Sequence, residues 1–198
     1  IGSSVVRSNY RDTFQRHLFS LAIWIGFFLT IILILLSYPI ALFFENMDLI
    51  LPTIFLSFKF ILDSFTYIPF AILHKRLEFN TAGKAQFYGS GLQISFTIIL
   101  ALLGFSYWSL ILPLYISPIV QFLYLMRKIN FNFRIYGWHA ALRSVHRIKS
   151  LLGNLSLYNL INYWSDNVDK VVIGKIYTQS DLGLYNRAFR FIQLSFKL

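Results

Sequence analysis

Residues 18–44 read LFSLAIWIGFFLTIILILLSYPIALFF and contain no charged side chain. A helix needs about 20 mostly apolar residues to cross about 30 Å of hydrocarbon, and this run is longer than that. A cleaved signal peptide would have a shorter apolar core followed by an A-x-A cleavage site, and neither feature is present. We therefore predict a membrane-spanning helix over these residues.

The composition of the whole chain also indicates a membrane protein. Hydrophobic residues make up 57% of the 198 residues, and charged residues only 13%, whereas globular domains carry about 25% charged residues. Such a chain could neither coat a water-soluble surface nor remain disordered. The lack of cysteine excludes disulfide frameworks, thiolate metal sites and cysteine nucleophiles.

Further apolar runs predict an all-α integral membrane protein, a polytopic bundle of five complete transmembrane helices plus the start of a sixth. These runs lack the two-residue alternation of a barrel strand, so no β-sheet is expected. The first four spans are expected at about 18–44, 49–73, 85–104 and 106–126, the fifth begins at residue 150, and the sixth begins at Leu182. Because the chain starts at Ile1 and stops inside an apolar stretch, we interpret it as a piece of a longer polypeptide.

This pattern divides the chain into two groups of helices. Residues 1–126 are expected to form part of an N-terminal lobe, and residues 150–198 the start of a C-terminal lobe. Between them, residues 127–149 form a basic linker. From Gly137 to Ser150, apolar residues recur at helical spacing with basic residues between them, which predicts an amphipathic helix in the head-group region.

The net charge of +10 comes mainly from three connecting segments. They hold 12 of the 18 basic residues: Arg7, Arg11, Arg16, Lys75, Arg76, Lys84, Arg127, Lys128, Arg134, Arg143, Arg147 and Lys149. The alternate connections, at 45–48, 105–107 and 178–181, contain no Lys or Arg. Since cytoplasmic loops are enriched in Lys and Arg, we expect the basic segments to face the cytoplasm and contact anionic lipid head groups. This placement argues against nucleic-acid binding.

Small residues indicate where helices can pack closely. Residues 104–107 are the expected hairpin between the third and fourth spans. Ala85 and Gly89 lie one helical turn apart, as do Gly91 and Ser95. Because small residues let helix backbones approach, we expect both pairs to lie at helix contacts.

Polar residues inside the apolar runs are the candidates for a functional site, because ionisable groups are costly in a bilayer. The fifth span carries a polar stripe at helical spacing, and two arginines follow it. The substrate-path candidates are Asn162, Asp166, Asp169, Lys170, Arg187 and Arg190, with Lys59 of the second span as a weaker one. Lipid offers no hydrogen-bond partners, so the stripe faces either protein, through interhelical hydrogen bonds, or a water-filled path.

Three of these candidates also have a simpler interpretation. Lys59 precedes Asp63 by one helical turn, so the two can neutralise each other. Arg187 and Arg190 could hold an anionic group through their forked donors, or they could extend to the membrane interface. No catalytic residue, cofactor or metal site is expected, because the chain has no phosphate-cradling glycine loop and no metal-binding histidine motif.

The fifth span and the segment that follows it resemble sequences of a known family. Residues 162–174 read NYWSDNVDKVVIG, and residues 182–190 read LGLYNRAFR. They resemble the central region of the Wzx-like polysaccharide flippases, in the multidrug/oligosaccharidyl-lipid/polysaccharide exporter superfamily. The family pattern is N-Y-x-S-x-N-x-D-x-x-x-I-G, a short loop, then L-G-x-Y-x-x-A-x-R. Asp166 stands where many relatives carry Arg, so the charge of that turn departs from the pattern.

The resemblance implies a chain of at least a dozen helices in two lobes around a central cavity, of which this sequence holds the third to the eighth. It also implies a task, moving an undecaprenyl-pyrophosphate-linked oligosaccharide across the bacterial cytoplasmic (inner) membrane for polysaccharide, O-antigen or capsule synthesis. Arg187 and Arg190 would then contact pyrophosphate. The carboxylates Asp166 and Asp169 would neutralise Lys170 between transport steps or couple to an ion.

The implied partners are the lipid-linked oligosaccharide, membrane lipids, and the glycan polymerase or export machinery. A multidrug or cation exporter of the same superfamily is an alternative, although it would require a cavity dominated by carboxylates. A membrane-embedded glycan polymerase or acyltransferase would need a clustered acid, base or nucleophile set, and the sequence displays none.

We predict that residues 2–17, 74–84 and 127–149 are all cytoplasmic. Single cysteines at Ser8, Thr81 and Asn132 should therefore resist a membrane-impermeant thiol reagent in intact cells. Labelling of any two of these positions would contradict the topology.

Overall fold

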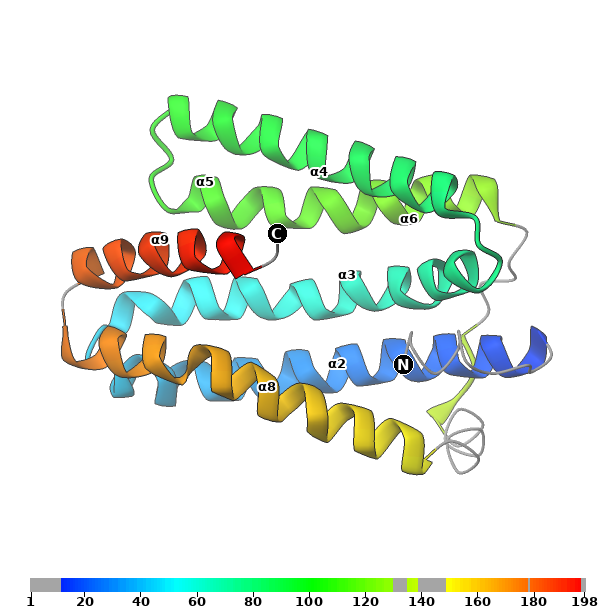
Figure 1. Cartoon of the computed structure of the whole chain (residues 1–198), viewed down its shortest axis with the longest axis horizontal. Coiled ribbons are helices and arrows are strands. Elements are labelled where there is room, and N and C mark those ends of the chain that lie inside the picture. Colours follow the sequence, from blue (N-terminus) through cyan, green and yellow to red (C-terminus); the bar gives the residue numbers. More distant parts are fainter. Residues whose placement is uncertain (1–11, 130–134, 139–148, 178, 197–198) are drawn as a thin grey trace.

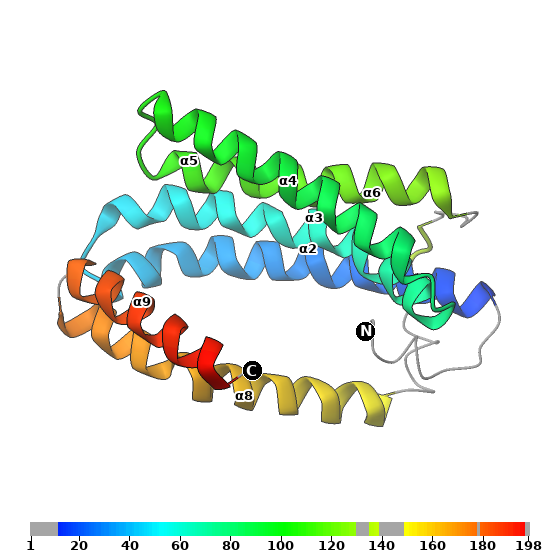
Figure 2. The same ribbon diagram turned by 45° about the horizontal axis from the view of Figure 1, so that its top comes forward.

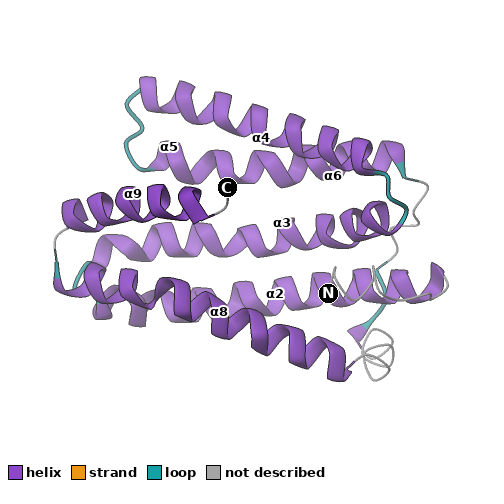
Figure 3. Cartoon of the chain, viewed as in Figure 1, coloured by secondary structure: helices purple, strands orange, loops and turns teal. Residues whose placement is uncertain are grey.

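The computed structural model describes residues 12–129, 135–138, 149–177 and 179–196. Every regular element in these ranges is a helix (Figure 3), which confirms the all-α fold class. The elements are α2 (Asp12–Phe43), η1 (Met47–Leu49), α3 (Ile50–Lys75), α4 (Phe79–Leu102), α5 (Trp108–Ile111), η2 (Leu112–Tyr115), α6 (Ile116–Lys128), α8 (Lys149–Ile176) and α9 (Gln179–Phe196).

Four segments of the described chain are long and apolar enough to cross a membrane, namely Phe14–Phe43, Met47–Lys75, Phe79–Leu102 and Trp108–Lys128. They confirm the first four predicted spans. Helix α8, with 28 residues, is also long enough, since a helix rises about 1.5 Å per residue. Its Asn, Asp and Lys side chains leave it less apolar than the other four, so a fifth crossing stays a prediction.

The first and third helices begin earlier than the predicted spans, at Asp12 and Phe79, and the fourth span is less regular than predicted. The third helix begins at Phe79 instead of residue 85, because an uncharged run marks the hydrocarbon core while the helix continues past Lys84 into the polar interface. The fourth span is a composite of α5, η2 and α6, with a 3₁₀ turn over Leu112–Tyr115. Pro113 lies in that turn, and a proline lacks the N–H that a regular α-helix would use there.

The predicted hairpin between the third and fourth spans is confirmed. Gly104 adopts a left-handed conformation with φ +82°, and Ser106 adopts one with φ +48°. Glycine meets no steric penalty in that region of the backbone map. The chain therefore reverses direction within residues 103–107, and α4 lies antiparallel to the composite span (Figure 1).

The four spans run up and down in the spatial order α2, α3, composite span, α4 (Figure 1). This topology brings basic residues from separate connections to one end of the bundle, here called the basic end: Arg16, Lys75, Arg76, Lys84, Arg127 and Lys128. The opposite end, here called the acidic end, carries Glu45, Asp48 and Asp181. Which end faces the cytoplasm stays a prediction.

The tightest helix contact joins α2 and α3. A Cβ atom at Gly26 would lie 2.7 Å from the carbonyl oxygen of Phe60 and 3.0 Å from Ser64 Cβ. One turn along, the buried Thr30 hydroxyl lies 2.9 Å from the carbonyl oxygen of Gly26 and 2.9 Å from that of Ser57. A hydroxyl that donates between helices is favourable in a setting that offers no water.

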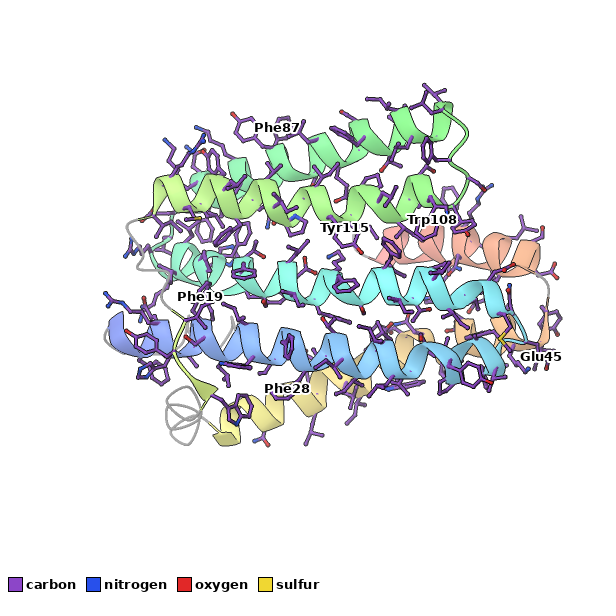
Figure 4. The ribbon with its side chains drawn as sticks, turned by 180° about the vertical axis from the view of Figure 1, so that it is seen from behind. Phe19, Phe28, Glu45, Phe87, Trp108 and Tyr115 are labelled. Carbon is purple, nitrogen blue, oxygen red and sulfur yellow. The ribbon has the colours of Figure 1, made fainter. Side chains whose placement is uncertain are left out.

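The remaining spans attach to α3 through apolar and polar contacts. Leu73 of α3, Ala85 of α4 and Leu125 of α6 belong to one buried cluster. In the 3₁₀ turn of the composite span, the Tyr115 hydroxyl donates to the carbonyl oxygen of Phe55. Phe87, by contrast, points away from the bundle and is 75% exposed (Figure 4), as expected for a side chain that faces lipid.

The two predicted small-residue pairs have different outcomes. Ala85 and Gly89 are buried, and a Cβ at Gly89 would lie 2.8 Å from Gln121 Cγ of α6, so this pair is confirmed as a close contact. The prediction that the second pair lies at a helix contact is wrong. Gly91 and Ser95 are exposed, and nothing lies within 4 Å of a Cβ at Gly91, because these residues lie on a face of α4 that no described helix covers.

The described part of the linker is bound to α2. The backbone N–H of Tyr136 donates to Ser20 Oγ at 2.8 Å, and Trp24 Nε1 donates to the Tyr136 carbonyl oxygen at 3.2 Å. Trp138 adds edge contacts to Trp24 and Phe28, with ring centroids 6.3 and 5.3 Å apart. The predicted amphipathic helix over 137–150 lies mostly outside the described residues.

The substitution Gly89→Leu should lower the Tm of the purified full-length protein, because the added side chain would collide with Gln121 and with the Ser117 carbonyl oxygen. Overpacking of this kind costs about 1–3 kcal/mol. Gly91→Leu, in open space on the same helix, is the matched control. Thermal unfolding in detergent measures both variants, and an equal Tm for the two would contradict the proposed α4–α6 contact.

Candidate functional site

The predicted polar stripe lies along one continuous helix, α8. Asn154, Tyr158, Asn159, Asn162 and Asp166 are all exposed. Apolar neighbours are equally uncovered: Ile161 is 67% exposed. The first half of α8 therefore has no covering helix within the described chain, and its polar side chains are not used in hydrogen bonds to another described helix.

Further along α8, two of the candidates contact α9. The Tyr185 hydroxyl donates to Asp169 Oδ2, and the backbone N–H of Lys170 donates to Asp169 Oδ1 at 2.9 Å. Tyr185 stacks on Phe189, with ring centroids 5.9 Å apart and planes at 17°. Asp169 therefore joins the two helices of the hairpin.

Lys170 is held by three groups. Its Nζ lies 3.0 Å from the carbonyl oxygen of Asp166, 2.8 Å from Asn167 Oδ1, and 4.8 Å from the centroid of the Phe189 ring. An ammonium over an aromatic face is attracted by the ring quadrupole. The atom of Asp166 that Lys170 contacts is the backbone carbonyl oxygen. Neutralisation of Lys170 by the Asp166 and Asp169 carboxylates between transport steps stays a prediction.

The two arginine candidates lie on α9. Arg187 is exposed and has no ion-pair partner among the described residues. The side chain of Arg190 lies outside the described part of the structure. The hairpin therefore brings Asp169 and Lys170 together with α9, while Asn162, Asp166 and Arg187 stay exposed around this contact.

Lys59 lies apart from the hairpin candidates in sequence, on α3. It forms an ion pair with Asp63, one helical turn away, as their spacing predicted. The two side chains are 34% and 22% exposed. Mutual neutralisation accounts for this pair in the structure, which makes Lys59 the weakest of the candidates.

The α8–α9 hairpin meets the four spans at the acidic end. Lys175 Nζ of α8 lies 2.5 Å from Glu45 Oε1, in the connection after α2, and 5.5 Å from the centroid of the Phe43 ring. Figure 4 places Glu45 where α2 ends beside the hairpin. The hydrogen bond and the charge of Lys175 lower the pKa of the Glu45 carboxyl below its ordinary value.

Toward the basic end, α8 diverges from α2. Both views show the two helices close where Lys175 lies and well separated where α8 begins (Figures 1 and 2). The exposure of Tyr158 and Trp164, at 64% and 53%, agrees with this separation. Asn154, Asn159 and Asn162 of the polar stripe therefore lie on the part of α8 that diverges from α2.

Sequence reasoning missed the groups that complete these contacts. Tyr185 and Phe189 are spaced one helical turn apart, a spacing at which aromatic side chains meet, and this signal could have identified them. Glu45 and Lys175 are separated by 130 residues. No local pattern indicates their pairing.

Four apolar spans beside a polar helical hairpin define an all-α polytopic membrane protein. The chain belongs to the polysaccharide biosynthesis protein family, whose model matches residues 1–198. A role in polysaccharide biosynthesis follows from this membership. Comparisons with curated proteins and with solved structures found no match.

The substitution Tyr185→Phe should loosen the α8–α9 hairpin, because it removes the hydroxyl that bonds to Asp169 while keeping the ring that stacks on Phe189. Amide hydrogen exchange over residues 179–189 of the full-length protein should become faster. Tyr163→Phe is the matched control, since Tyr163 is 64% exposed and its hydroxyl has no described partner. Equal exchange in both variants would show that the Asp169 bond does not hold the hairpin.

Proposed function

We propose that this chain forms part of a flippase that moves a lipid-linked oligosaccharide across the bacterial cytoplasmic membrane. The observation that carries the proposal is the uncovered polar face of α8, on a helix long enough to cross the bilayer. Membership of a polysaccharide biosynthesis family supplies the class of cargo. On this proposal the protein is a transporter and not an enzyme.

The physical problem of such a transporter is the polar head of its cargo. Sugar hydroxyls cannot enter hydrocarbon without losing their hydrogen bonds, which costs about 2–7 kcal/mol per group, and an ionised pyrophosphate costs far more. A path lined by amide and carboxylate side chains replaces water as the hydrogen-bonding partner. Asn154, Asn159 and Asn162 offer such donors and acceptors along one exposed face.

The charged groups near the α8–α9 contact differ in how freely they could bind the cargo. Lys170 is already engaged by Asn167, by a backbone carbonyl and by Phe189, so its charge is partly satisfied within the protein. Arg187 is exposed on α9. Guanidinium matches phosphate oxygens through two parallel hydrogen bonds, which makes Arg187 the stronger candidate for the pyrophosphate contact, with Arg190 one helical turn further along.

In the full-length protein, Arg187→Ala and Arg190→Ala should each abolish glycan export while membrane levels stay normal. Arg187→Lys should recover part of the export, because lysine keeps the charge but lacks the fork. The assay is surface glycan in cells that carry each variant as the only copy.

The matched control is Arg127→Ala, which removes an exposed arginine at the basic end and should leave export unchanged. Normal export by both the Arg187→Ala and the Arg190→Ala variants would refute the anion contact and leave these arginines as interfacial anchors.

A further inference from the structure

The hairpin and the four-span bundle are joined by a small group of side chains at the acidic end. The ion pair between Lys175 and Glu45 is one contact, and the position of Lys175 Nζ over the Phe43 ring is a second. A third is the close approach of Gly174, whose Cβ would lie 3.4 Å from Phe44 Cε1. All three join the last turns of α8 to the end of α2.

These contacts lie at one end of a long helix. Helix α8 runs from Lys149 to Ile176 and diverges from α2 toward the basic end (Figures 1 and 2), where its side chains are exposed. A helix held at one end acts as a lever, since a small rotation at the contact moves the far end by many ångströms. The position of the polar stripe relative to the bundle therefore depends on the contact at Lys175.

The chemistry of this contact allows α8 and α2 to separate at the acidic end. It consists of exposed polar and aromatic side chains instead of an interdigitated apolar core: the Glu45 side chain is 81% exposed and that of Lys175 is 33% exposed. Exposed ion pairs are weak because water competes for both charges. The cation–π contact with Phe43 adds a modest attraction.

We propose that Glu45 and Lys175 form a latch that closes the acidic end between the two lobes and must open during transport. The inference rests on the proposed flippase function. With the latch closed, α8 is separated from α2 only toward the basic end. With the latch broken, α8 can move away from α2 at the acidic end, which gives the cargo an exit on that side. Because the bond is weak, binding of cargo elsewhere can shift the balance between the two arrangements.

The test measures the distance across the latch in the full-length protein in lipid nanodiscs. Spin labels are attached to cysteines introduced at Met47 and Ser180, which are exposed on either side of the contact; this part of the chain has no cysteine of its own. The unaltered pair should give mainly a short distance. Glu45→Lys places two ammonium groups together and should shift the population to longer distances.

Two further variants show whether charge pairing causes the shift. The double variant Glu45→Lys with Lys175→Glu restores opposite charges and should return the short distance. Glu45→Gln removes the charge but keeps the shape, and it should give a smaller shift in the same direction. Glu78→Lys is the matched control. It breaks the Arg76–Glu78 pair at the basic end, and this pair does not join the hairpin to the bundle.

The outcomes separate the latch from the transport function. An unchanged distance distribution in Glu45→Lys, or a shift that the charge exchange fails to reverse, would overturn the latch. If the distances shift and reverse as expected while cells lacking the protein still export glycan, Glu45 and Lys175 still hold the acidic end closed, and the proposed flippase function fails. Loss of export in Glu45→Lys, with both the short distance and export restored in the charge-exchanged variant, would support both the latch and the flippase function.

Discussion

In hydrocarbon no water is available to backbone N–H and C=O groups, and the rest of this structure depends on that constraint. It requires the spans to be helices, and it requires each buried hydroxyl to find a hydrogen-bond partner. Ser57, Ser64 and Thr66 of α3 meet the requirement within their own helix, while Thr30 reaches both its own helix and α3. Among the described residues, no buried side-chain nitrogen or oxygen is left without a partner.

The same constraint makes α8 informative. Its amide and carboxylate side chains would be costly against lipid, yet they are exposed along half of the helix. In the four apolar spans the charged pair Lys59 and Asp63 is neutralised within one helix. The contrast separates an apolar bundle from a hairpin with a row of uncovered polar side chains, and this division is compatible with the proposed transport of polar cargo.

The two parts are joined by contacts of different strength. Within the bundle, α2 and α3 approach so closely at Gly26 that no larger side chain fits without a shift. Between the bundle and the hairpin, Lys175 makes an ion pair and a cation–π contact at the surface. Packed cores resist deformation, whereas exposed ion pairs open readily. Relative motion is therefore expected between the hairpin and the bundle instead of within the bundle.

The sequence by itself determined the helical class, four of the spans, the hairpin at Gly104 and the pairing of Lys59 with Asp63, because each depends on residues that are neighbours along one helix. It also singled out the polar stripe of α8 and the basic segments. Only the tertiary structure decided that Gly89 lies at a helix contact while Gly91 does not, that Asp169 bonds to Tyr185, and that Glu45 meets Lys175. Those outcomes depend on how each helix is rotated about its axis and where it crosses its neighbours. The hydropathy pattern of a single helix determines neither.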